Sequence, residues 1–82
     1  MSDYLENPHR IKLGEAIRAR RDRLGMTQEA LAEKVGSGQS NIYRIESGLV
    51  SVGFDKLFQI AQALGMTVGE LVSFKAHNKP GE

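Results

Sequence analysis

The chain has 82 residues, which is enough for one small domain with a limited hydrophobic core. Its composition, 40% hydrophobic and 26% charged with a net charge of +1, is ordinary for a soluble globular protein and predicts only weak non-specific binding to nucleic acid. The absence of cysteine from the sequence excludes a disulfide framework, a thiolate metal site and a cysteine nucleophile.

The first predicted helix follows a polar N-terminal arm, residues 1–8, and ends at Gly25. Asn7 is a suitable N-cap, and Pro8 suits the first helical position because the backbone N–H that proline lacks would be unpaired there. One face of this helix is formed by residues at helical spacing: Leu13, Ala16, Ile17, Arg20 or Arg21, and Leu24. Six basic and two acidic residues lie within 10–23, a bias that suits nucleic-acid contact but is also typical of a solvated helix face.

Two short helices joined by a tight turn are predicted for residues 27–48. Thr27 is a plain N-cap of the first, since no Glu three residues later completes a capping box, and Gly36 ends it. The second spans residues 39–47 and ends at Gly48. Its polar face consists of Gln39, Ser40, Tyr43, Arg44 and Ser47. Such side chains can read base edges, although an ordinary amphipathic surface helix has the same pattern.

Two closing helices complete the predicted fold. The fourth begins near Phe54, at a poorly marked start, and ends at Gly65, whereas the short fifth begins with a capping box over residues 67–70. The expected core comprises Leu13, Ile17, Leu24, Met26, Leu31, Val35, Ile42, Ile45, Leu57, Ile60 or Phe58, Ala61, Leu64 and Leu71. The predicted fold is therefore all-α, a compact five-helix bundle over residues 9–72 that is followed by a C-terminal tail, residues 73–82.

The sequence shows no active site. The two histidines lie near opposite ends of the chain, no serine has an obvious histidine partner, and no His, Asp and Glu cluster has metal-ligand spacing. Gly36-x-Gly38 is not a phosphate-binding loop, because no strand precedes it and no Lys-Ser/Thr pair follows it. We therefore expect no enzyme, no metal and no cofactor. No apolar run approaches the ~20 residues of a membrane span and no signal peptide opens the chain, so a cytoplasmic location is expected.

The spacing of residues 13–72 resembles the phage repressor and Cro type of helix-turn-helix, the XRE-like family. The central match is Thr27-Gln28, Leu31-Ala32, Gly36, Ile42, Arg44-Ile45-Glu46 and Gly48. It is flanked by Leu13-Gly14-Glu15 on one side and by Leu57-x-x-Ile60-Ala61 and Glu70-Leu71 on the other. The resemblance implies a lambda-repressor-like bundle whose helices 2 and 3 form the helix-turn-helix, and it implies double-stranded DNA as the partner.

The resemblance also implies roles for particular residues, because helix 3 of this family enters the major groove. The candidate base contacts are Gln39, Ser40 and Arg44. The candidate DNA-backbone contacts are Gln28, Tyr43, Ser47 and Gly48. Gln28 is also expected to brace Gln39, and surface packing is an equally good interpretation of Tyr43. Arg21 and Glu46 are implied to form a structural ion pair, which would offset the unfavourable position of a Glu in the last turn of a helix.

The expected function is that of a sequence-specific DNA-binding transcriptional regulator, of repressor or controller type, that binds a palindromic operator as a homodimer. The dimer surface is expected to include helix 5, Val72 and Phe74. The alternative is an antitoxin or protein-interaction module of the same fold. Such a protein would bind a partner protein, such as a toxin, and would autoregulate its own promoter.

Overall fold

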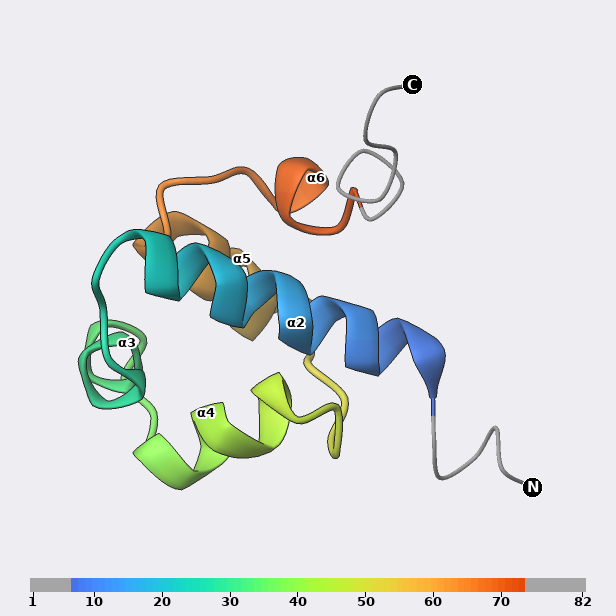
Figure 1. Cartoon of the computed structure of the whole chain (residues 1–82), viewed down its shortest axis with the longest axis horizontal. Helices are drawn as coiled ribbons and strands as arrows, with labels where there is room; N and C mark the ends of the chain where they lie inside the picture. The colour runs from blue at the N-terminus through green and yellow to red at the C-terminus, as the bar shows by residue number, and fades with distance from the viewer. Residues whose placement is uncertain (1–6, 74–82) are drawn as a thin grey trace.

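A computed structural model describes residues 7–73, and within them the chain forms five helices and no strand (Figure 1). The helices are α2 (Pro8–Arg23), α3 (Gln28–Lys34), α4 (Gln39–Glu46), α5 (Phe54–Ala63) and α6 (Val68–Leu71). The predicted all-α bundle is confirmed, and α2 begins at Pro8, the first helical position that the sequence predicted. The predictions for most of the two terminal segments, including Phe74 in a dimer surface, lie outside the described residues.

Local signals in the sequence set the helix boundaries. The Asn7 side chain accepts hydrogen bonds from two backbone N–H groups in the first turn of α2, and the Thr27 side chain accepts one at the start of α3. Thr67 and Glu70 form the predicted capping box of α6. Gly53 supplies no side-chain cap to α5, in agreement with the poorly marked start. Four helices end at a glycine of positive φ, namely Gly25, Gly36, Gly48 and Gly65.

The hydrophobic core draws on all five helices. Its fully buried side chains are Ile17, Leu31, Ile42, Ile60, Leu64 and Leu71. Burying one Leu or Ile side chain is worth about 1.5–3 kcal/mol, so each of these residues contributes substantially to holding the helices together. Leu13, Met26 and Leu57, which the sequence analysis placed in the core, are partly buried against this cluster.

The prediction that Leu24 belongs to the core is wrong, since 47% of this residue is exposed. Leu24 is the C-cap of α2 and directly precedes the turn at Gly25, so it lies at the very end of the helix rather than within the packed face. Arg21, one turn earlier, is buried in its place.

The prediction left open whether Ile60 or Phe58 belongs to the core, and the structure selects Ile60. Ile60 is fully buried, whereas 48% of Phe58 is exposed. Leu57, Ile60, Ala61 and Leu64 form the i, i+3, i+4, i+7 stripe that faces the other helices. Phe58 lies on the flank of that stripe and stacks on Phe54 with ring centroids 6.4 Å apart.

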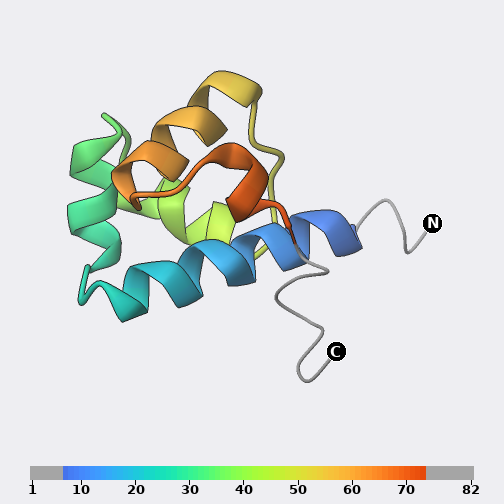
Figure 2. The same cartoon turned by 90° about the horizontal axis from the view of Figure 1, so that it is seen from above.

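The arrangement of the helices places α4 at one edge of the molecule. Figure 1 shows α2 across the middle, with α4 and α6 on opposite sides of it, and Figure 2 shows α6 lying over α2. α4 packs against both α2 and α3, so two neighbours fix its position while its far side faces away from the bundle.

Candidate nucleic-acid interface

The two faces of α4 differ sharply in burial. Ile42, Ile45 and Glu46 are buried against the bundle. The predicted base contacts Gln39, Ser40 and Arg44 are exposed, as are Ser47 and Tyr43, of which 54% is exposed. Gly38 precedes the helix without a side-chain cap, and a Cβ built there would meet nothing within 4 Å. The start of α4 is therefore an open backbone edge followed by exposed amide and hydroxyl side chains.

Gly14 sets the distance between α2 and α4. A Cβ at this buried position would lie 2.6 Å from the carbonyl oxygen of Ile45 and closer still to that of Glu46. The two helix backbones therefore touch where they cross. Glycine inside a helix costs about 1 kcal/mol relative to alanine, and this close approach offsets that cost. The sequence did contain a signal for this contact, because an isolated glycine inside a helical pattern usually has a packing or functional reason.

Gly48 provides a second close approach between the same helices. Its φ is +74°, and a Cβ there would lie 2.8 Å from Cγ1 of Ile11 in α2. The Gly48 N–H donates to the carbonyl oxygen of Ile45 at 3.0 Å, so this donor already has a partner at the end of α4. A contact of Gly48 with the DNA backbone remains a prediction, and Ser47 beside it is exposed.

Arg21 and Glu46 form a bidentate ion pair between α2 and the last turn of α4. Arg21 Nε donates to Glu46 Oε2 at 2.7 Å, and Arg21 Nη2 donates to Oε1 at 3.0 Å. Each residue is only 8% exposed. The hydrogen bonds to Glu46 raise the pKa of the Arg21 guanidinium, because they stabilise its charged form. This geometry fixes the rotation of α4 relative to α2, since a planar guanidinium meets a carboxylate in one orientation.

Two further groups complete this buried network. Arg21 Nη1 donates to the carbonyl oxygen of Met26 at 2.7 Å, which ties the turn after α2 to the ion pair. Gln28 Nε2 donates to Glu46 Oε1 at 2.9 Å. The side chain that was expected to contact a phosphate and to brace Gln39 is thus bonded to Glu46. Its contact with DNA and its bond to Gln39 remain predictions.

A surface hollow of about 540 Å³ lies between α2 and α4 and brings several predicted residues together. Three of the four predicted DNA-backbone contacts, Gln28, Tyr43 and Ser47, line it, and Arg21 and Glu46 line it as well. Its remaining lining residues are Ile11, Glu15 and Arg18. Arg18 was not among the predicted site residues, because the sequence analysis considered it only as part of the basic stretch 10–23, for which a solvated helix face was an alternative. Gln39 belongs instead to a hollow of about 470 Å³ beside the start of α3.

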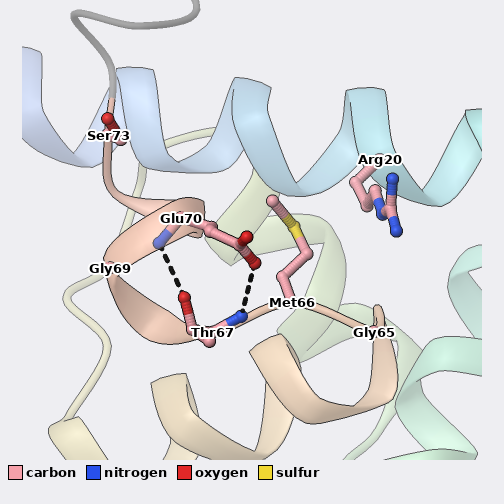
Figure 3. Close-up of a pocket in the computed structure, with 7 residues that line it drawn as sticks. All are labelled: Arg20, Gly65, Met66, Thr67, Gly69, Glu70 and Ser73. Atoms are coloured by element: carbon pink, nitrogen blue, oxygen red, sulfur yellow. Dashed lines mark hydrogen bonds between the residues drawn. The ribbon is translucent and has the colours of Figure 1, made fainter.

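Another hollow, of about 630 Å³, lies between α2 and α6 and contains none of the predicted site residues (Figure 3). Arg20 lines it but donates from Nε to the carbonyl oxygen of Leu64 at 3.0 Å, which caps the end of α5. Thr67 and Glu70 are bonded to each other in the capping box. Arg20, Thr67 and Glu70 therefore have structural roles in this hollow.

Within residues 7–73, no cluster of three or more His, Cys, Asp or Glu side chains could hold a metal ion. The helices of this part of the chain include none that is long and apolar enough to cross a membrane.

Comparison with known proteins gives a match to a family model and similarity to several regulators. Residues 17–71 match the family model described as helix-turn-helix. An HTH-type transcriptional regulator of Sinorhizobium medicae, itself uncharacterized, is 40% identical over 76 residues, which cover 93% of this chain and 52% of that protein. The chain thus spans about half the length of this relative.

Two solved structures of regulators share the fold. The clp gene regulator ClgR from Corynebacterium glutamicum superimposes with a TM-score of 0.80 at 29% identity, over 84% of this chain and 73% of that one. The restriction-modification controller protein C.AhdI from Aeromonas hydrophila superimposes with a TM-score of 0.72 at 31% identity, over 74% of this chain and 92% of that one.

Proposed function

This chain belongs to the helix-turn-helix family of XRE-type transcriptional regulators, and we propose that it binds a specific DNA operator through α4. In this proposal α4 enters the major groove, with Gln39, Ser40 and Arg44 at base edges. The amide of Gln39 can bond N6 and N7 of an adenine together, and Arg44 can reach O6 and N7 of a guanine or a phosphate.

The observation that carries the proposal is that α4 exposes a polar face while contacts on its buried side fix its orientation. The backbone contact at Gly14 and the bidentate pair of Arg21 with Glu46 hold the buried side of α4. Rigid presentation suits base readout, because hydrogen bonds to base edges require the donors and acceptors to be in register. Gln28, Tyr43 and Ser47 line the adjacent hollow, where they could contact the flanking phosphates.

The proposal further includes a homodimer on a palindromic operator. A twofold dimer that places two copies of α4 in successive major grooves needs half-sites whose centres lie roughly 34–36 Å apart, one turn of the duplex. Analytical ultracentrifugation of the chain with its selected operator tests this directly. A strict monomer on that operator would contradict the dimer.

Selection from randomised duplex DNA, followed by gel shifts at two salt concentrations, tests the proposed readout. Gln39→Ala is expected to lose about 1–3 kcal/mol of affinity for the selected site and to leave binding to random DNA nearly unchanged. Gln62→Ala is the matched control, because this glutamine is exposed on α5. An equal loss on both DNAs would make Gln39 a backbone contact. Failure of the selection to enrich any sequence would overturn sequence-specific binding.

One observation favours the second candidate function, an antitoxin or interaction module that binds a partner protein and autoregulates its promoter. Phe54 and Phe58 are stacked and exposed on α5, which is unusual for a surface that meets only water. Affinity purification from the native host, with Phe58→Ser as the comparison variant, tests it. A stoichiometric partner that is lost with Phe58→Ser would support this function, whereas recovery of the chain alone would count against it.

A further inference from the structure

We propose that Glu46 is a positioning residue for DNA binding, because its buried carboxylate holds the Gln28 amide in the orientation that meets a DNA phosphate. The inference rests on the proposed function and adds a second role to the ion pair. The pair fixes the angle of α4, and through Gln28 it also fixes where the backbone contact lies relative to the base-reading side chains.

The chemistry of the contact determines how the Gln28 amide is turned. An ionised carboxylate only accepts hydrogen bonds, so the amide nitrogen has to face Glu46 Oε1, and the 2.9 Å distance is that of a hydrogen bond. The reversed amide would place two oxygens against each other. The nitrogen carries two hydrogens, and Glu46 Oε1 accepts one of them. The second N–H can donate to another acceptor, and Gln28 lines a surface hollow where an anionic ligand could supply one.

The carboxylate of Glu46, which accepts this hydrogen bond, is itself held in place. Glu46 is buried and receives two hydrogen bonds from Arg21, and Arg21 is held in turn by the carbonyl oxygen of Met26. A glutamine on a surface helix would otherwise sample several rotamers and lose that freedom on binding. Fixing it before binding removes part of this entropic cost, so the network should increase affinity without touching DNA.

The surroundings of Gln28 identify the ligand as a backbone phosphate. Gln28, Tyr43, Ser47 and Arg18 line one hollow beside the exposed face of α4, and each can donate a hydrogen bond to a phosphate oxygen. Arg18 adds a positive charge, which partly balances the carboxylate of Glu15 in the same hollow. The amide, phenol, hydroxyl and guanidinium groups are all hydrogen-bond donors, and such a set suits the oxygens of a phosphodiester group.

A double-mutant cycle in DNA affinity tests the inference. Arg21→Met/Glu46→Leu replaces the ion pair by apolar side chains, a change that is often neutral or stabilising, and it removes the acceptor of Gln28. In the native background, Gln28→Ala should weaken operator binding about tenfold or more, the loss typical of a hydrogen bond to a charged group. In the apolar background the same change should cost about threefold or less, because the amide is no longer positioned. Gln62→Ala should cost nothing in either background.

Two further measurements keep the outcome interpretable. Glu46→Gln retains an acceptor oxygen, so the large effect of Gln28→Ala should persist there even though the melting temperature falls. In the absence of DNA, the side-chain amide protons of Gln28 should give NMR signals protected from exchange in the native chain and unprotected in Arg21→Met/Glu46→Leu. Unprotected signals in the native chain would overturn the positioning role. Because this measurement needs neither DNA nor the apolar variant, it also serves in place of the double-mutant cycle if that variant fails to fold.

The possible failures can be distinguished. If the native chain binds its operator and Gln28→Ala costs the same factor in both backgrounds, the positioning role is overturned and the proposed function stands. If the native chain binds no DNA, both the proposed function and the phosphate contact are overturned.

Discussion

Gly14→Ala is the most direct test of how α4 is held. The added methyl group would lie 2.6 Å from the carbonyl oxygen of Ile45, whereas ordinary contacts begin at 3.4 Å, so α2 and α4 have to separate by about 1 Å. Overpacking of this kind costs about 1–3 kcal/mol, and its upper end applies because the facing atoms are backbone and cannot swing away. The higher helix propensity of alanine offsets about 1 kcal/mol of this loss in the free energy of unfolding. We therefore expect a net loss of about 2 kcal/mol.

Thermal unfolding followed by circular dichroism measures this loss. For a domain of this size, about 2 kcal/mol corresponds to a fall in melting temperature of roughly 8–16 °C. Gly69→Ala is the matched control, since a Cβ there meets only Thr67 Oγ1 at 3.8 Å, and it should be neutral or slightly stabilising. Operator affinity should also fall for Gly14→Ala, because the base contacts move with α4. A melting temperature equal to or above that of the native chain would refute the close-approach argument.

Three other predictions concern the ion pair, salt and the cap of α5. Glu46→Ala should cost up to about 3–5 kcal/mol because it removes the bidentate partner of the buried Arg21, to which only the exposed Asp22, at 3.4 Å, offers another carboxylate. The double variant with Arg21→Ala should lose less than the sum of the single losses; simple additivity in thermal melts would mean that the two residues do not interact. The log–log salt dependence of operator binding should be shallow, because most predicted phosphate contacts are uncharged; a slope near −10, the value of a strongly charge-dependent repressor, would place the basic stretch 10–23 along the DNA backbone. Gly53→Ser should stabilise α5 by a few tenths of a kcal/mol by adding the missing cap, and an unchanged melting temperature would show that this helix start is not limiting.

The sequence by itself determined the helices, because the signals that start and stop a helix act within one turn. Asn7, Thr27 and Thr67 each bond a backbone N–H that no helical partner can reach, and glycines of positive φ end the helices where the pattern placed them. The start of α5 near Phe54 was also located, although only by the onset of apolar spacing. Family spacing then identified the helix-turn-helix and, with it, the exposed face of α4.

The tertiary structure decided which of the apolar residues were used. Helical spacing admitted Leu24 and either Phe58 or Ile60, yet only Ile60 is buried. Apolar residues at helical spacing show which face of a helix is buried. They do not show how much of that face the neighbouring helices cover. Leu24 therefore failed as a core residue, because it is the C-cap of α2 directly before the turn at Gly25 and 47% of it is left exposed.

The resemblance implied the pair of Arg21 with Glu46, but only the tertiary structure could assign the other contacts that hold the proposed site. Gln28 and Glu46 are separated by 18 residues, and their hydrogen bond depends on the angle at which α3 meets α4. The contact of Gly14 with the backbone of α4 depends in the same way on where two helices cross. Caps and turns are settled by neighbours along the chain, whereas crossing points are settled by the packing of all five helices at once, and the orientation of α4 is a property of that packing.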